Sequence, residues 1–284
     1  MSIAKSVVRL GAGASLALTL LSGARIGHAE PPDVPIIAGM RVVFAVSDST
    51  APAGKDTGIV QGDYEMVVEI TSVTADAVAE KAFIDGFDAD RVRRRGSIPR
   101  MVATADVANS HEQVFGFHSE DPPAVGGTTS LGPSHAVIRD LLRTGTAAYS
   151  FRNFVSRGTV SGMLRRSAAS PVKFPVLIDG KRVELDGIHA TGQMTLNGAS
   201  RPFETVILDH PRYPLSLRIA YGPRDGAFPF TPAFVREIIR IDLPTTQETV
   251  AGALARECRV EVPGIYFDFN QATIKRNSQI LSTN

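Results

Sequence analysis

Apolar and polar residues alternate along most of the central chain, which is the period-2 pattern of half-buried β-strands. The clearest example is Asp63 to Val73, where Tyr64, Met66, Val68 and Ile70 share one face. Comparable runs predict further strands at Met40 to Val46, Ala77 to Ile84, Met101 to Val107, Gln113 to Phe117, Thr146 to Phe151, Thr159 to Leu164, Lys173 to Ile178, Arg182 to Leu185, Ile188 to Leu196, Arg201 to Leu208, Leu215 to Tyr221 and Phe234 to Leu243.

Two dipeptides in this series are typical of tight hairpin turns. Asp179-Gly180 separates two of the predicted strands, and Asn197-Gly198 separates two others. Both dipeptides favour turns with positive φ angles, which match the twist of antiparallel strands. Short strands at this spacing, without βαβ alternation, predict a mainly β fold, either an antiparallel β-sandwich or an open barrel with one or two short helices.

Helical periodicity occurs at two places. Pro133-Ser134 supplies a cap, and apolar residues then recur at helical spacing as far as Gly145, which provides a stop. The second place is Thr245 to Arg259, where Thr245 and Glu248 are spaced as a capping box. We therefore expect a short helix inside the β domain and a linker helix after it.

The N-terminus has the three parts of a secretory signal peptide. Lys5 and Arg9 are basic, and Leu10 to Leu21 is a short apolar run. Gly27-His28-Ala29 then places small residues where a signal peptidase cleaves. The alternative is an uncleaved anchor, but the apolar run is shorter than the roughly 18 residues of a spanning helix. We therefore predict export, with cleavage before Glu30.

Charge and cysteine content narrow the function classes. The chain has 30 basic and 29 acidic residues, and three basic residues lie in the predicted signal peptide. The mature chain is thus slightly acidic, and nucleic-acid binding is not expected. Cys258 is the single cysteine, so no internal disulfide is expected. It is either buried and inert, or it pairs with a residue of a part of the protein missing after Asn284 or with another chain.

Motifs for catalysis are weak. Asp56-Thr57-Gly58 is the tripeptide of aspartic proteases, but it follows Gly54-Lys55 and not an apolar strand. No Gly-x-Ser-x-Gly, His-Glu-x-x-His or Cys-x-x-Cys occurs. We therefore expect no enzyme activity, cofactor or metal, and interpret Asp56 as part of a polar turn. His189 is expected to be a hydrogen-bonded histidine of a sheet.

Two charged clusters are candidate ligand sites. Asp85, Asp88 and Asp90 supply carboxylates for a weak calcium site, or they form a solvated loop. A basic run follows at Arg91, Arg93, Arg94 and Arg95. Guanidinium groups pair with anionic oxygens, so this run is a candidate anion-binding patch for lipid A phosphates or peptidoglycan carboxylates. The alternative is an exposed flexible loop.

A family signal lies near the end of the chain, in Gly264 to Ser278. Ile265, Phe267 and Phe269 alternate with polar positions as in a strand, and Asn270 ends the alternation. This run resembles the opening of an OmpA-like domain, the module with which envelope proteins of Gram-negative bacteria bind peptidoglycan. The matching residues are Tyr266, Phe267, Asp268, Phe269, Ala272 and Ile274.

The resemblance implies a non-enzymatic envelope protein in the periplasm or outer membrane of a Gram-negative bacterium. The later part of the family's α/β domain, which holds the peptidoglycan stem peptide, is missing after Asn284. Peptidoglycan binding is therefore expected only of a full-length parent. The alternative is a periplasmic binding or carrier domain for an apolar or glycan ligand. The expected organisation is a signal peptide over 1–29, a β domain over 36–244, a linker helix over 245–259 and the start of an OmpA-like domain over 260–284.

Overall fold

The computed structural model describes residues 34–48, 61–87, 93–115, 123–153, 158–196, 198–222 and 232–244, which are mainly β-strand. The predicted signal peptide, linker helix and OmpA-like segment lie outside these residues, as do Asp56 and Cys258. The mainly β prediction is confirmed for the described part of the chain.

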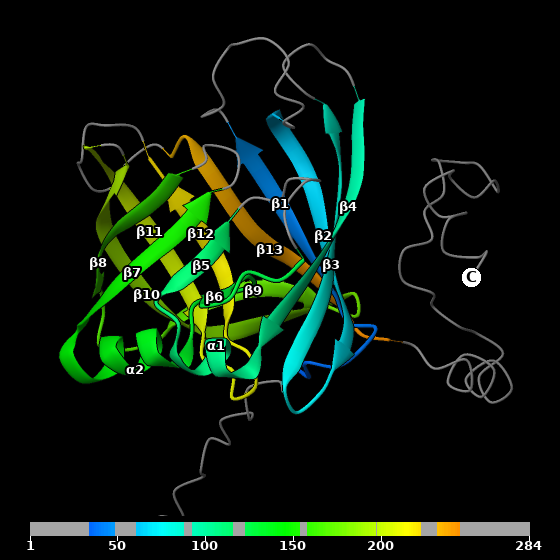
Figure 1. The fold of residues 1–284 in the computed structure, drawn as a ribbon, viewed down its shortest axis with the longest axis horizontal. Helices are drawn as coiled ribbons and strands as arrows, with labels where there is room; N and C mark the ends of the chain where they lie inside the picture. The colour runs from blue at the N-terminus through cyan, green and yellow to red at the C-terminus, as the bar shows by residue number, and fades with distance from the viewer. Residues whose placement is uncertain are drawn as a thin grey trace, which may run out of the picture. The chain divides into compact units, whose positions relative to one another are not determined.

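Figure 1 shows the strands and helices of this domain. The strands are β1 Arg41–Asp48, β2 Gln61–Val73, β3 Ala77–Phe87, β4 Arg93–Ala103, β5 Glu112–Phe115, β6 Thr128–Thr129, β7 Thr146–Asn153, β8 Gly158–Arg166, β9 Val172–Ile178, β10 Lys181–Leu196, β11 Ala199–Leu208, β12 Leu215–Tyr221 and β13 Phe234–Asp242. The helices are α1 Thr104–Asn109 and α2 His135–Thr144.

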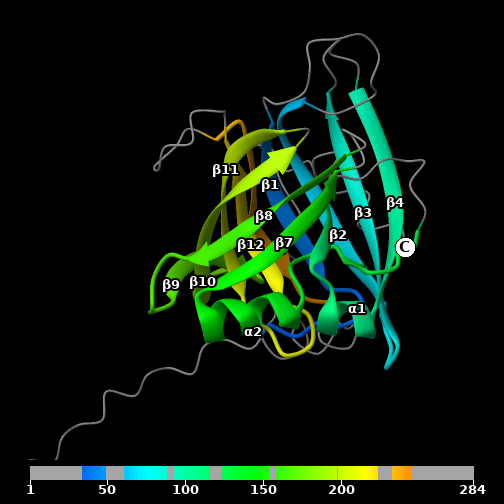
Figure 2. The same ribbon diagram turned by 60° about the vertical axis from the view of Figure 1, so that its left-hand side comes forward.

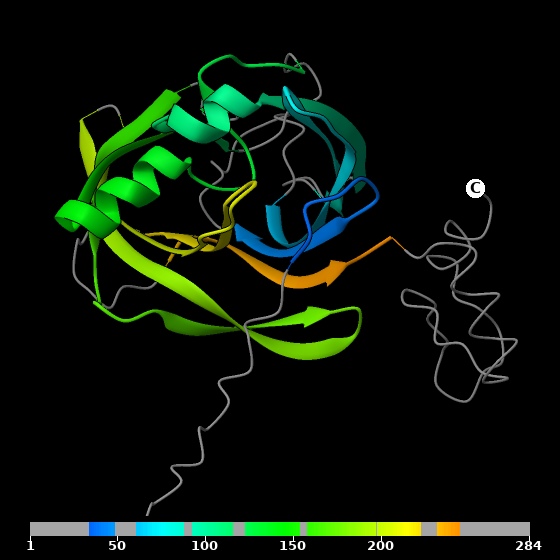
Figure 3. The ribbon, with the colours of Figure 1, turned by 90° about the horizontal axis from the view of Figure 1, so that it is seen from below.

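The described strands form one continuous sheet, so the sandwich alternative is not what they build. Its order is β4-β3-β2-β1-β13-β12-β11-β10-β8-β7-β5-β6. The sheet curls so that its first strand, β4, contacts the segment before β6: Met101 of β4 forms a bridge with Ala124, and its amide donates to the Pro123 carbonyl at 2.6 Å. Figure 2 shows the curled sheet from the side, and Figure 3 shows it from one end as a ring of strands.

Five strands also pair in a closed ring, because β9 pairs with both β10 and β13. The first part of β10, up to Gly187, pairs with β9, and the rest pairs with β8 and β11. Gly187 lies against β11, where a Cβ would be 2.4 Å from Val206 Cγ1. The β9–β10 hairpin therefore packs outside the main curl, and β11 and β12 are buried on both faces (Figure 3).

Both helices lie across the same end of the curled sheet (Figures 2 and 3). The caps predicted for α2 are confirmed. Ser134 Oγ accepts from the Val137 amide, and Gly145 ends the helix with a φ of 77°. Neither helix of the described residues is long and apolar enough to cross a membrane. We call this end, with the loops beside it, the helical end.

Several boundary predictions are wrong. The predicted strand Met101 to Val107 stops at Ala103, because Thr104 bonds to the β2–β3 turn and begins α1. The arginine run is not a flexible loop from Arg93 onward, because β4 pairs with β3 there. Asp85 likewise lies in β3 and not in a loop.

Two further departures concern pairing. The predicted strands before and after Gly187 are one continuous β10, since close packing at this glycine does not break the strand. The sheet is not purely antiparallel either: β5 runs parallel to β6 and β7, and β13 runs parallel to β9. Both hairpins are confirmed as pairings, and Asp179 and Gly180 have the expected positive φ angles of 47° and 76°.

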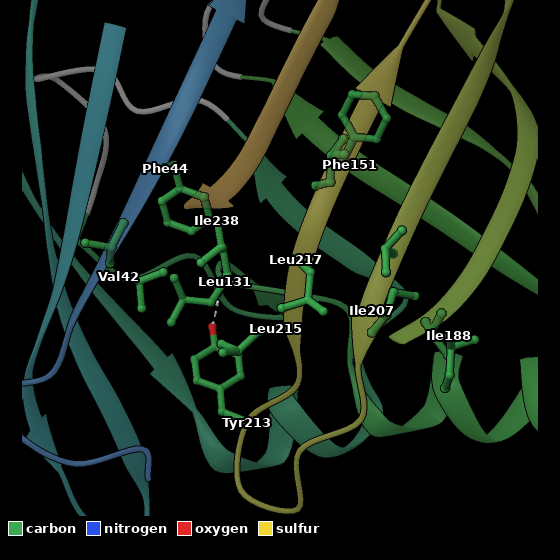
Figure 4. Close-up of a cluster of buried hydrophobic side chains, with 14 of the residues drawn as sticks. Val42, Phe44, Leu131, Phe151, Ile188, Ile207, Tyr213, Leu215, Leu217 and Ile238 are labelled. Carbon is green, nitrogen blue, oxygen red and sulfur yellow. Dashed lines mark hydrogen bonds between the residues drawn. The ribbon is translucent and has the colours of Figure 1, made fainter. Parts of the chain in front are cut away.

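The core follows the alternation of the strands. Val42, Phe44 and Ile238 face the interior of the curl, together with Leu131 from the helical end (Figure 4). Burial of such side chains stabilises the fold by about 1.5–3 kcal/mol each. The same inward positions on other strands carry polar and charged side chains, and these form the site described next.

Candidate functional site

Arg236 lies at the centre of a polar cluster inside the curled sheet. It occupies an inward position of β13 and is 3% exposed. Its guanidinium carbon lies 4.9 Å from the centroid of the Phe44 ring, a cation–π distance. Other ionisable groups act electrostatically on Arg236. They are Tyr149 of β7, Tyr64 of β2, Glu80 of β3 and Tyr213 in the segment before β12.

A hydrogen-bond network holds the Glu80 carboxyl. Ser130 Oγ donates to Glu80 Oε2 at 2.6 Å and lies 2.8 Å from the Tyr213 hydroxyl. That hydroxyl accepts from the backbone amides of Ser130 at 3.0 Å and Leu131 at 3.2 Å, the second of which Figure 4 shows. Arg100 is directly opposite Glu80 in the β3–β4 register. The network therefore connects the Glu80 carboxyl of β3 to the loops of the helical end by hydrogen bonds.

Gln113 extends the network to β5 and β7. Its Nε2 donates to the Ser130 carbonyl at 2.5 Å, and the Tyr149 hydroxyl donates to its Oε1. Gln113 is fully buried, and Tyr149 is 5% exposed. An amide that donates at one atom and accepts at the other is held in one orientation.

Burial controls the ionisation of these groups. It raises the pKa of Glu80 from 4.5 to about 7, although hydrogen bonds from Ser130 and Tyr213 and the charges of Arg100 and Arg236 act in the opposite direction. Burial also lowers the pKa of Arg236 to about 10. The pKa values of Tyr64, Tyr149 and Tyr213 are raised, again mainly by burial. The tyrosines are therefore neutral, and Glu80 titrates near neutral pH.

Aromatic side chains line the interior beside this cluster. Phe151 of β7 and Phe203 of β11 stack with their ring centroids 5.5 Å apart, although two strands separate them in the sheet. Tyr149 lies 5.9 Å from Phe203, and Tyr221 meets Phe151 edge-on at 6.0 Å. Contacts between such distant strands show that these rings face the interior. The Arg201 guanidinium lies 5.4 Å from the Tyr221 ring.

The side chains of this arrangement can form hydrogen bonds, pair with charges and make apolar contacts. Ser130 is 1% exposed, and its hydroxyl is engaged by Glu80 and Tyr213, so it is not placed as a nucleophile. Within the described ranges, no group of three or more His, Cys, Asp or Glu side chains could hold a metal ion. What remains is a set of hydrogen-bonding and charged groups beside apolar rings.

Two residues of the predicted anion-binding patch, Arg93 and Arg95, lie elsewhere, on the outside of β4. Arg93 forms two hydrogen bonds of 2.7 Å with Asp85, and Arg95 Nε donates to the same carboxylate at 3.0 Å. These contacts lower the pKa of Asp85. Arg94 lies in β4, opposite Gly86, and Arg91 lies outside the described residues. One carboxylate thus offsets part of the charge of the patch.

The other sequence-based candidates have separate outcomes. His189 is a hydrogen-bonded histidine of the sheet, as predicted, with its Nε2 3.2 Å from Glu204 Oε1. Asp88, Asp90 and the OmpA-like motif residues fall outside the described residues.

The interior charges were missed, although the sequence contains a signal for them. Glu80 stands between Val78 and Ala82 on the apolar face of its strand, and Arg100 stands likewise between Ile98 and Val102. A charged residue at such a position is buried with the strand face. Glu80 and Arg100 lie near the charges of other strands only because the sheet curls. The alternation of apolar and polar residues within one strand does not reveal this curl.

Comparisons with known proteins give no relative. No family model, curated protein or solved structure matches the chain. The functional assignment therefore depends on the geometry of the interior.

Proposed function

We propose that the β domain is a non-enzymatic binding or carrier module of an exported envelope protein, and that it holds an apolar ligand inside the curled sheet. The observation that carries this proposal is the convergence of polar side chains on Arg236 in an otherwise apolar interior. Ligand sites combine mainly apolar walls with a few polar groups that fix orientation. An interior that served stability alone would favour apolar side chains, because buried charge costs free energy.

The aromatic group indicates the apolar part of the ligand. Tyr149, Phe151, Phe203 and Tyr221 form a continuous set of ring contacts inside the sheet. When an alkyl chain enters between these rings, contacts between the chain and the rings replace contacts between the rings. This favours an apolar ligand over the glycan alternative, which needs more polar partners than these rings offer.

Calorimetric titration of the purified protein with dodecanol tests the proposal. We expect saturable binding at one site and a rise of several degrees in Tm at saturating ligand. Phe151→Ala should weaken binding about tenfold, because it removes a buried ring from the site. Phe87→Ala is the matched control, since Phe87 is 55% exposed, and it should bind as wild type does. Absence of binding to the wild-type protein would contradict the proposal.

Export is the second part of the proposal. It is supported by the signal-peptide pattern of residues 1–29 and by the resemblance of Tyr266 to Ile274 to an OmpA-like opening. Expression of the full chain in a Gram-negative host, followed by fractionation and N-terminal sequencing, tests it. We expect the protein in the periplasmic or outer-membrane fraction, with Glu30 as the first residue. Cytoplasmic protein that retains Met1 would contradict this part.

A further inference from the structure

The charges inside the curled sheet are mainly positive among the described residues. Arg100, Arg201 and Arg236 occupy inward positions of β4, β11 and β13. The inward acids are Glu80 and, toward the end away from the helices, Asp48 of β1, whose charge acts on Tyr64. Arginine remains charged in proteins even when it is buried. The interior therefore has a positive potential.

Glu80 is in addition an imperfect counterion. Its pKa of about 7 means that the carboxyl is partly protonated at neutral pH. Its Oε2 accepts from Ser130, while its Oε1 has no hydrogen-bond partner among the described residues although Glu80 is 2% exposed. A buried polar atom left in this state destabilises the fold. A ligand oxygen that accepts a hydrogen bond from the protonated carboxyl would supply the missing partner.

The fully buried Thr129 shows the same deficiency. Its hydroxyl has no hydrogen-bond partner among the described residues, and Thr129 lies in β6, directly before Ser130. Unsatisfied buried polar atoms are rare in native proteins and call for a partner. Here, two such atoms lie on adjoining parts of the network that also contains the arginines.

We propose that this interior cluster binds the carboxylate of a single-chain amphiphile, with Arg100 and Arg236 as its charge partners and the apolar chain lying along Phe151 and Phe203. This inference rests on the proposed function and adds the chemical class of the head group. A monoanion fits because one carboxyl, Glu80, already faces two guanidinium groups. The protonated form of Glu80 donates a hydrogen bond to the ligand carboxylate, and the guanidinium groups donate charge-assisted ones.

Parallel calorimetric titrations with dodecanoate and dodecanol at neutral pH test the inference, because the two ligands share a chain and differ in the head group. We expect wild-type protein to bind dodecanoate at least about tenfold more tightly than dodecanol. Equal affinities would overturn the head-group inference and leave the proposed function standing. Failure of both ligands to bind would overturn both.

Variants then locate the charge partner. Arg236→Met should remove the preference for dodecanoate, so that dodecanoate and dodecanol bind within about twofold of each other. Arg93→Met changes an exposed arginine of β4 and should keep the preference, which separates the interior from the outer patch. Circular dichroism verifies folding, and Arg100→Met serves if Arg236→Met does not fold. A preference retained in a folded interior variant, or one lost in Arg93→Met, would overturn the assignment of the site.

Discussion

At the scale of single residues, Glu80 is the most informative position. Its carboxyl is buried, accepts from Ser130 and faces the guanidinium groups of Arg100 and Arg236. The two arginines favour the charged form, whereas burial favours the neutral one, and burial is the larger effect. Glu80 therefore carries a proton in the native state at pH values where it would be ionised in the unfolded chain.

This proton makes stability depend on pH. Because the pKa of Glu80 is raised from 4.5 to about 7 on folding, its contribution to the free energy of unfolding is complete below about pH 4.5 and decreases as pH rises through 7. The total effect is roughly 3 kcal/mol. Glu80→Gln cannot titrate, so we expect its unfolding free energy to change less between about pH 5 and about pH 8.

Urea unfolding of both proteins at these two pH values measures the difference. Other titrating groups contribute equally to wild type and variant and cancel in the comparison. Asp85→Asn is a suitable control, because Asp85 lies on the outer side of the same strand with its pKa lowered. An identical pH dependence in wild type and Glu80→Gln would show that Glu80 is ionised in the folded protein.

At the scale of elements, the β9–β10 hairpin determines how the closed ring of five strands is built. Gly187 permits β10 to pass close to β11, with a Cβ there only 2.4 Å from Val206 Cγ1 and 3.5 Å from Leu217 Cδ1. Phe174 and Leu185 of this hairpin are buried and belong to the main hydrophobic cluster. This packing explains why β11 and β12 are buried on both faces.

Gly187→Ala tests this packing. We expect a loss of about 1–3 kcal/mol in unfolding free energy, because the methyl group overlaps Val206 and the hairpin must move outward. Gly96→Ala in β4 is the matched control, since a Cβ at Gly96 meets nothing within 4 Å, and its effect should stay within about 0.5 kcal/mol. Thermal or urea unfolding checks both, and equal effects would mean that the hairpin is not held at Gly187.

Local patterns predicted the elements and both hairpins well, and some element boundaries poorly. The caps of α2, the turn at Asp179-Gly180 and the strand Leu215–Tyr221 depend on neighbouring residues alone, and they were predicted from them. The end of β4 at Ala103 depends on a contact with the distant β2–β3 turn, which periodicity does not contain.

The site was predicted less well than the fold for the same reason. Each inward charge is visible as an exception to alternation in its own strand, at Glu80, Arg100 or Arg236. Their proximity arises only when the curl brings β3, β4 and β13 around one interior. The arginine run near Arg93 was prominent in sequence, yet it pairs with Asp85 on the outside.

At the scale of the whole molecule, the described β domain closes its sheet within residues 34–244. Its last strand, β13, already pairs with both β1 and β12, and β4 meets the segment at Ala124. The described pairings are made within residues 34–244, so we propose that the segment resembling an OmpA-like opening adds little to this sheet. It is expected to contribute to envelope association and not to the stability of the β domain.

Deletion of Gly264 to Asn284 tests that separation. We expect Tm to change by less than about 2 °C, because a domain of this size shifts by roughly 2–4 °C for each kcal/mol lost. Solubility should improve, because the deleted segment contains the alternating apolar residues Ile265, Phe267 and Phe269, a pattern that promotes aggregation. A large decrease in Tm on differential scanning calorimetry would show that the segment packs in the core.

The central claim, that an amphiphile binds inside the curled sheet, is tested most directly by quenching of tyrosine emission. The chain has no tryptophan and five tyrosines, of which Tyr64, Tyr149, Tyr213 and Tyr221 are described and line or border the interior. In the Tyr266→Phe variant, a dodecanoate that is brominated along its chain should quench this emission saturably. Unlabelled dodecanoate should compete with the brominated ligand and restore the emission. Binding without quenching would place the ligand on the outer surface and contradict the account.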